Sequence, residues 1–203
     1  MSAKGRLALL IILLVLVVDQ SLKIWIKTHM MIGEEHQILG NWFIIHFTEN
    51  NGMAFGFEFG KQYGKYFLSI FRIAAVIFIG FYISRILKKE VPVGYLVAVS
   101  LIFAGAMGNI LDSAFYGLIF NHSYYQVAQL FPPEGGYAGF LQGRVVDMLY
   151  FPIIEGHWPS WSPIHPTEPF IFFRPVFNIA DSAITTGMFM IILFHRKTLQ
   201  KEL

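Results

Sequence analysis

Residues 91–111 read VPVGYLVAVSLIFAGAMGNIL, and they are followed directly by Asp112. This stretch has 21 residues and no charged side chain. A helix needs about 20 apolar residues to cross the hydrocarbon core of a bilayer, which is about 30 Å thick. Because an unpaired backbone is not tolerated in lipid, we expect this segment to be a membrane-spanning helix.

Three further segments are of similar length and largely apolar, with one or two charged side chains each. They are residues 7–26, 66–84 and 176–194. Hydrophobic residues make up 55% of the chain and charged residues only 14%, and the mean hydropathy is +0.55. Soluble domains carry about 25% charged residues, so this composition indicates an integral membrane protein. We expect one all-α domain over residues 1–203, with four membrane-spanning helices.

Lys and Arg residues gather in three short segments on one side of the predicted helices. Eight of the fifteen lie there: Lys4, Arg6, Arg85, Lys88, Lys89, Arg196, Lys197 and Lys201. Cytoplasmic loops carry an excess of Lys and Arg, so we expect both termini in the cytoplasm. The two long loops, about 27–65 and 112–175, are then expected on the outer side of the membrane.

The first outer loop contains a β-like stretch, WFIIHFT at 42–48. It runs into the turn signal Asn50-Asn51-Gly52 and then into residues 54–59. Short runs of β-branched and aromatic residues beside a turn signal are typical of strands. We therefore expect a small sheet or hairpin at the membrane surface.

The four aspartates all lie in or beside apolar sequence. Asp19, Asp112 and Asp181 lie in or at the ends of predicted spans, and Asp147 lies in the second outer loop within VVDML. A carboxylate near hydrocarbon costs several kcal/mol, roughly 3 on insertion scales. All four are expected at one depth near the outer membrane surface, which makes them candidates for function. The nine glutamates lie in loops or near the termini, where a charge costs little.

Polar neighbours support three of these aspartates. Two of them follow an asparagine by three residues, which is on the same helix face. These pairs are Asn109 with Asp112 and Asn178 with Asp181. Each amide can orient a neighbouring carboxyl or bind backbone. Asp19 and Lys23, four residues apart, can form an ion pair, which is also what a purely structural helix pair would show.

Two carboxyls held close together cannot both ionise easily, so they share a proton, and one acts as a base while the other acts as an acid. With a water between them, such a pair can hydrolyse a peptide. Asp147 and Asp181 are the best candidates, because one is expected in a flexible loop and the other on a helix. The residues alone also allow a proton relay in a small transporter or lipid-binding membrane protein, and a purely structural role.

Other chemistries find little support in the sequence. Cysteine is absent, which excludes disulfides, thiolate metal sites and cysteine nucleophiles. The seven histidines are scattered without an H-E-x-x-H pair, and neither a P-loop nor a G-x-S-x-G pattern occurs. The net charge of +2 gives no nucleic-acid signature. We therefore expect no metal, no organic cofactor and no nucleic-acid partner.

Five short motifs follow one another along the chain. They are DQSLK at 19–23, NNGMAF at 50–55, GAMGNILD at 105–112, GRVVD at 143–147 and FNIADSAI at 177–184. They are similar to the D-Q-x-x-K, N-x-G-x-A-F, G-G-x-x-G-N-x-x-D-R, G-x-V-V-D-F and F-N-x-A-D-x-x-I motifs of bacterial lipoprotein signal peptidase, or signal peptidase II. Each motif is short, but five in order within a chain of four predicted spans are specific together.

This resemblance implies an aspartyl endopeptidase embedded in the bacterial cytoplasmic (inner) membrane, with its active site near the outer face. Its substrates would be prolipoproteins, cut on the amino side of a diacylglyceryl-modified cysteine among the membrane lipids, and globomycin would inhibit it. The resemblance implies Asp147 and Asp181 as the catalytic pair, without a cofactor. The positions that shape or support the site would be Asp19, Lys23, Asn50, Asn109, Asp112 and Asn178. Strand pairing near Asn50 and Gly52 would clamp the extended peptide.

The chain departs from the family pattern at three places. Ser113 stands where the family has an Arg that contacts the substrate backbone, and Arg144 is a candidate substitute. Met148 stands where the family has Phe. Residues 118–142 and 153–174 are longer than in short family members. They are either a lid or docking surface, or tolerated surface insertions.

Overall fold

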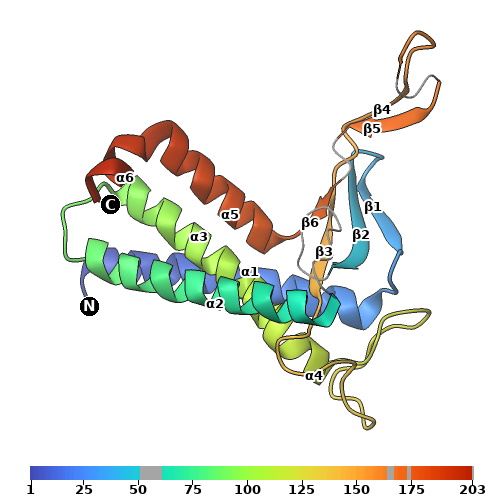
Figure 1. Ribbon diagram of the computed structural model, residues 1–203, viewed down its shortest axis with the longest axis horizontal. Helices are drawn as coiled ribbons and strands as arrows, with labels where there is room; N and C mark the ends of the chain where they lie inside the picture. Colours follow the sequence, from blue (N-terminus) through green and yellow to red (C-terminus); the bar gives the residue numbers. More distant parts are fainter. Residues whose placement is uncertain (51–60, 164–166, 173–174, 203) are drawn as a thin grey trace.

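The computed structural model describes residues 1–50, 61–163, 167–172 and 175–202. A bundle of long helices carries a small sheet at one end, and a second sheet projects beyond it (Figure 1). The helices are α1 (Ala3–His29), α2 (Lys61–Ile86), α3 (Val93–Leu111) and α5 (Ile179–Met190). α3 continues through the π-helical turn η2 (Asp112–Tyr116) into α4 (Gly117–Ile119), and α5 through η3 (Ile191–His195) into α6 (Arg196–Glu202).

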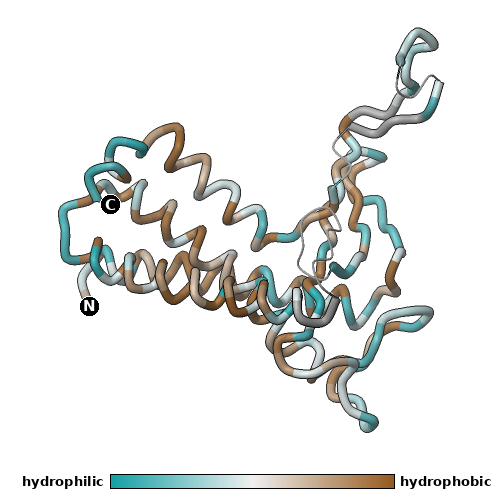
Figure 2. The backbone as a smooth tube through the Cα atoms, viewed as in Figure 1, coloured by the Kyte–Doolittle hydropathy of each residue, from teal (hydrophilic) through white to brown (hydrophobic). Residues whose placement is uncertain are grey.

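Within the described residues, three helices are long and apolar enough to cross a membrane: Ala3–His29, Gly64–Ile86 and Val93–Ile119. Apolar residues run along the middle of the helices, and hydrophilic residues lie at their connections (Figure 2). The fourth predicted segment differs, because its first residues form strand β6 (Val176–Phe177) and its helix begins only at Ile179. The structure confirms a mainly helical membrane fold with a small antiparallel sheet, and a fourth span stays a prediction.

Small residues bring α3 and α5 into close contact. A Cβ atom on Gly105 would lie 2.2 Å from the backbone oxygen of Ala180, and one on Gly187 would lie 2.5 Å from that of Ala98. Small residues at helix interfaces allow such close backbone approach in membranes. The first turn of α5 is therefore fixed against α3, next to the end of the bundle that carries the sheet.

The sheet joins both outer loops. Its strands are β1 (Glu35–Leu39), β2 (Phe43–Asn50), β3 (Val145–Tyr150) and β6, antiparallel in the order β1-β2-β3-β6. The predicted β-like stretch is thus a strand, but it pairs with the preceding β1 and with β3. Residues 54–59 lie outside the described part of the chain. The second sheet consists of β4 (Ile154–His157) and β5 (Pro169–Phe172).

Asp147 lies in strand β3, so its predicted place in a flexible loop is wrong. The residues Val145–Leu149 are all buried, and the core around them includes Ile26 and Met30 from the end of α1. A strand covered on both faces reads as a continuous apolar run without alternation. The periodicity that normally reveals a strand is therefore missing from this sequence.

The second outer loop folds back onto the end of α3. The backbone N–H of Gly143 donates to the oxygen of Ser113 at 2.8 Å, and that of Ala138 donates to the oxygen of Gly117 at 2.9 Å. A Cβ atom on Gly143 would lie 2.1 Å from the oxygen of Asp112. Only glycine allows this approach, which sets the start of β3 beside the helix end.

Candidate active site

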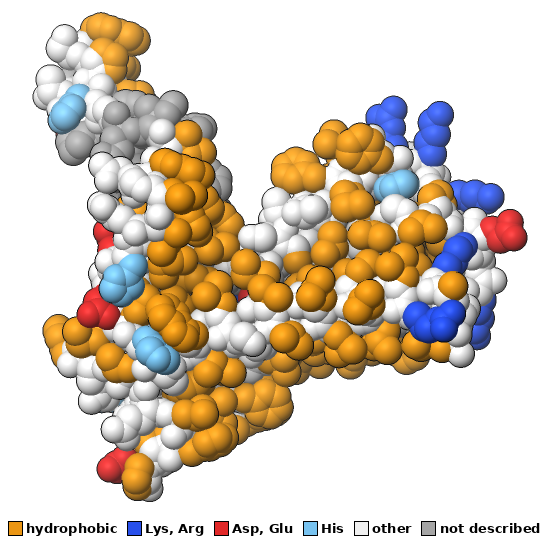
Figure 3. Space-filling view, turned by 180° about the vertical axis from the view of Figure 1, so that it is seen from behind, with side chains coloured by type: hydrophobic (Ala, Val, Ile, Leu, Met, Phe, Trp, Pro, Cys, Tyr) orange, Lys and Arg blue, Asp and Glu red, His pale blue; other side chains and the backbone are white. Residues whose placement is uncertain are grey.

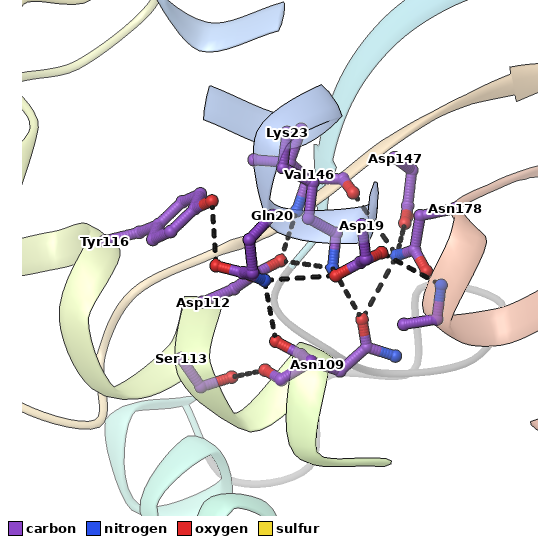
Figure 4. A network of polar contacts seen from close by, with 12 residues as sticks. Asp19, Gln20, Lys23, Asn109, Asp112, Ser113, Tyr116, Val146, Asp147 and Asn178 are labelled. Atoms are coloured by element: carbon purple, nitrogen blue, oxygen red, sulfur yellow. Dashed lines mark hydrogen bonds and ion pairs between the residues drawn. The ribbon is translucent and has the colours of Figure 1, made fainter. Parts of the chain in front are cut away.

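Lys23 lies at the centre of a buried polar cluster where the helices meet the sheet (Figure 4). Its Nζ is 2.9 Å from Asp19 Oδ2 and 2.8 Å from Asp112 Oδ2, and it donates to Asn109 Oδ1 at 3.0 Å. An ammonium group has three N–H donors, so each of them has a partner. Gln20 Nε2 donates to both carboxylates, at 3.0 and 2.9 Å. The predicted pair of Asp19 and Lys23 is confirmed, and Asp112 completes it.

The two carboxylates bound to Lys23 also fix neighbouring elements. Asp19 Oδ1 accepts a hydrogen bond from the backbone N–H of Ala180 at 2.9 Å, which ties the start of α5 to α1. Asp112 Oδ2 accepts from the backbone N–H of Val146 at 3.2 Å, which ties β3 to the end of α3. In both cases the bonded residue directly precedes a member of the candidate catalytic pair. The buried ion pairs therefore set the backbone positions of that pair.

Asn178 bridges the candidate carboxyls. Its Nδ2 donates to Asp147 Oδ1 at 2.7 Å, and its Oδ1 accepts from the backbone N–H of Asp181 at 2.8 Å. The Asp181 side chain accepts in return from the Asn178 backbone N–H at 3.4 Å, which forms a capping box. Asn109 Nδ2 donates to Asp181 Oδ1 at 2.8 Å. Each asparagine thus orients a carboxyl, but Asn109 reaches Asp181 on another helix rather than its neighbour Asp112.

Asp147 sits in an environment that favours its protonated form. Burial, and next the charge of Asp181, raises the pKa of Asp147 to about 7. Hydrogen bonds donated by Asn178 and Asn50 favour the ionised form and act in the opposite direction. Near neutral pH Asp147 can thus carry a proton, as a general acid requires.

Arg144 directly precedes β3, and its described contacts lie outside the Lys23 cluster. Its Nη1 is 3.3 Å from Glu49 Oε2. Its guanidinium carbon lies 5.3 Å from the ring centroid of Tyr124 and 5.5 Å from that of Tyr137. Both tyrosines belong to the long segment 118–142, so this segment holds Arg144 against Glu49.

Three further positions singled out in the sequence are Asn50, Gly52 and Ser113. Asn50 ends β2 and donates a hydrogen bond to Asp147 Oδ2. Gly52 lies outside the described residues. Ser113, where the family has Arg, is buried, and its hydroxyl donates to the backbone oxygen of Asn109 at 3.1 Å.

A second buried ion pair, between Lys27 and Glu49, was not predicted. The side chains are 0% and 1% exposed, and Lys27 Nζ also donates to Ser123 Oγ at 2.9 Å. Lys27 Nζ lies 5.2 Å from the ring centroid of Phe120 and 5.3 Å from that of Tyr137. The expectation that glutamates lie where a charge costs little is therefore wrong for Glu49. The available signal was the spacing 19, 23, 27, which places three charges on one face of α1.

Comparison with known proteins gives a consistent result. The family model of signal peptidase II matches residues 11–196. The chain is 50% identical over 196 residues to the lipoprotein signal peptidase of Porphyromonas gingivalis, a match that covers 96% of this chain and 85% of that protein. It is 40% identical over 194 residues to the lipoprotein signal peptidase of Amoebophilus asiaticus, with 94% and 78% covered.

Solved structures agree with these relatives. A bacterial membrane enzyme determined by the in meso method has a TM-score of 0.58 to this chain and 25% sequence identity, with 97% of this chain and 91% of that chain covered. Another bacterial membrane enzyme structure has a TM-score of 0.55 and 26% identity, with 92% and 90% covered.

Proposed function

This chain belongs to the signal peptidase II family and is an aspartic endopeptidase that cleaves signal peptides from prolipoproteins, and we propose that Asp147 and Asp181 are its catalytic carboxyls. The proposal rests above all on Asn178, whose one side chain contacts both residues. Asp147 lies on β3 and Asp181 on α5, far apart in the chain. Asn178 binds the Asp147 carboxyl and caps α5, so this one residue links the two elements that carry the pair.

The proposed reaction uses one proton on the pair. The ionised carboxyl, assigned to Asp181, takes a proton from water, and the water oxygen attacks the scissile carbonyl carbon. The protonated carboxyl, assigned to Asp147, donates its proton to the carbonyl oxygen. When the C–N bond breaks, the proton on Asp181 passes to the leaving amine. A hydroxyl of the intermediate returns a proton to Asp147, which restores the starting state.

The supporting residues have distinct proposed roles. Asp19 and Asp112, both paired with Lys23, hold the backbone on either side of the site. Asn109 orients Asp181, and Asn50 orients Asp147. The site thus has its hydrogen-bond donors aimed before substrate arrives, which avoids reorganisation during the reaction.

The finer substrate proposal is a diacylglyceryl-modified cysteine directly after the cleaved bond. The site lies at the sheet end of the helices, whose sides carry exposed apolar residues such as Leu14, Ile70 and Phe78. A substrate whose signal helix and acyl chains share the bilayer with these helices would present its scissile bond at the level of the sheet.

Lipid modification is expected to decide whether a precursor peptide is cleaved. We expect purified enzyme in micelles to release the signal sequence from a diacylglyceryl-modified peptide and to cut the unmodified peptide more than about 100-fold more slowly. The reason is that each buried CH₂ group contributes about 0.8 kcal/mol to anchoring. Mass spectrometry of the products identifies the cleaved bond, and their accumulation over time gives the cleavage rate. Equal cleavage rates for the modified and unmodified peptides would contradict lipid recognition. The catalytic pair is tested separately, because Asp147 and Asp181 variants should lose cleavage of both peptides.

We also propose four spans with both termini in the cytoplasm of a bacterial inner membrane and the active site near its outer face. Lys and Arg gather at the end of the bundle opposite the sheet (Figure 3). Exposed members of this group are Arg6, Arg85, Lys88, Arg196, Lys197 and Lys201. The positive-inside rule supports this orientation.

The absence of cysteine permits a direct test of this topology. Tyr125, which is 98% exposed, lies on the sheet side, and Lys88 is exposed between α2 and α3. We expect a membrane-impermeant maleimide to label Tyr125→Cys in intact spheroplasts, and Lys88→Cys only after permeabilisation. The opposite labelling pattern would reverse the orientation, and labelling of both in intact cells would exclude it.

A further inference from the structure

Arg72 is the only charged residue of the span segment 66–84, and it is partly buried. Lys65, Ser69, Arg72 and Val76 follow at spacings of four, three and four residues, which places them on one side of a helix. Lys65 Nζ donates to the oxygen of Gln142 at 2.6 Å, and Ser69 Oγ donates to that of Leu141 at 3.2 Å. Val76 is buried on the same side.

This face of α2 therefore lies against the segment that leads into β3 and, deeper, against α3. Seven residues of helix place Arg72 about 10 Å further along the axis than Lys65, since each residue rises about 1.5 Å. From there the guanidinium is within electrostatic range of the catalytic pair. Its electrostatic interaction is strongest with Asp181 and weaker with Asp112 and Asp147.

The charges around the site explain why a second cation matters. Lys23 brings one positive charge to the two carboxylates of Asp19 and Asp112, which leaves one excess negative charge. A catalytic pair that holds one proton adds a second negative charge. Arg144 pairs with Glu49, and Lys65 donates to the backbone oxygen of Gln142. Among the described side chains, Arg72 is thus the cation of α2 that faces the carboxylates from α5, η2 and β3.

We propose that Arg72 is a positioning residue of the cleavage reaction, whose fixed positive charge keeps the Asp147–Asp181 pair singly ionised while the enzyme works. The proposal rests on the assignment of that pair under Proposed function. It also accounts for a neutral Ser113 at the end of α3, because the positive charge of this site comes from the neighbouring helix. Without Arg72, the excess negative charge would favour uptake of a second proton by the pair, and no base would remain.

The test compares pH profiles of kcat/KM on the lipidated peptide for Arg72→Met, Arg72→Gln and Arg72→Lys. Loss of a nearby opposite charge favours protonated carboxyls, typically by about one pH unit or more. We therefore expect both limbs of the profile to move to higher pH in the two neutral variants, the acidic limb by about one unit. Arg72→Lys should restore the limbs to within a few tenths of a unit.

Lys65→Gln is the matched control, because it removes a cation from the same face of α2 whose Nζ donates to the backbone oxygen of Gln142 and which interacts electrostatically with Arg144 and Glu49. Its acidic limb should stay in place even if its rate falls. Neutral Arg72 variants that are slow but keep the wild-type acidic limb would overturn the proposal. The proposal would also be overturned if Arg72→Met and Arg72→Gln failed to fold while Arg72→Lys folded. If Asp147→Asn keeps activity in the wild-type background, the proposed function fails instead, independently of Arg72.

Discussion

Asp147→Asn and Asp181→Asn, each made alone, are expected to lower kcat for signal-peptide release by about 10³-fold or more. Positioned acid and base catalysis is worth about 10²–10⁴-fold, and an amide can neither take a proton from water nor donate one as a carboxyl does. Asn178 can keep hydrogen bonds to an amide at either position, so both variants should fold. Single-turnover cleavage of the lipidated peptide measures the loss, and thermal unfolding in detergent checks the fold.

The control for this pair is Glu134→Gln, which removes an exposed carboxylate from the second outer loop. It should retain the wild-type rate. Turnover within tenfold of wild type in either aspartate variant would exclude that residue from the chemistry. An equal loss in Glu134→Gln would show that the assay reports net charge rather than catalysis.

The helical part of the fold could be predicted because lipid leaves few alternatives. Three of the four apolar segments correspond to helices of spanning length within the described residues. Two of these helices extend beyond both predicted ends, and the third begins at Val93, inside the predicted start, and runs on to Ile119. The fourth began too early in the prediction, because Val176 and Phe177 are as apolar as a span. Asn178 decides the boundary there by capping α5 with its side chain, a local hydrogen-bond effect that hydropathy does not record.

The part of the site that could be predicted consists of charged residues in apolar sequence, because a charge there is costly unless it has a partner. Asp19, Lys23 and Asp112 are buried together, as carboxylates in apolar sequence indicate. The strand around Asp147 could not be predicted, since β3 is buried on both faces. The partners across elements were also beyond the sequence, because spacing along one helix shows only neighbours on that helix. Asn109 illustrates this, since its carboxyl partner is Asp181.

Glu49 shows a further limit of composition. A glutamate in a polar-looking outer loop carries no apolar flank to signal its burial. Its burial follows from the sheet, where Glu49 on β2 pairs with Val146 on β3, and from the long segment whose Ser123 and Tyr137 cover Lys27. The segment 118–142 therefore has at least a structural role, since it closes one side of a buried ion pair.

Glu49→Gln is expected to lower the free energy of unfolding by about 3–5 kcal/mol, the usual cost of removing one partner of a buried ion pair. Lys27 would then keep a buried positive charge without its anion. Arg144, 29% exposed, would lose the same partner but could be solvated. Denaturant titration in detergent measures the difference from wild type.

The decisive comparison is the double variant Lys27→Met/Glu49→Gln. It leaves no buried charge, and Met fits among the rings that surround Lys27, so it should be more stable than Glu49→Gln alone. Glu35→Gln is the control, because the Glu35 and His46 side chains of that pair are 47% and 27% exposed, and exposed pairs contribute about 0–1 kcal/mol. The double variant could instead be as unstable as the sum of the two single changes. Lys27 would then contribute through packing and its aromatic contacts. The second outer loop would in that case be held to α1 by these contacts rather than by the charge pair with Glu49.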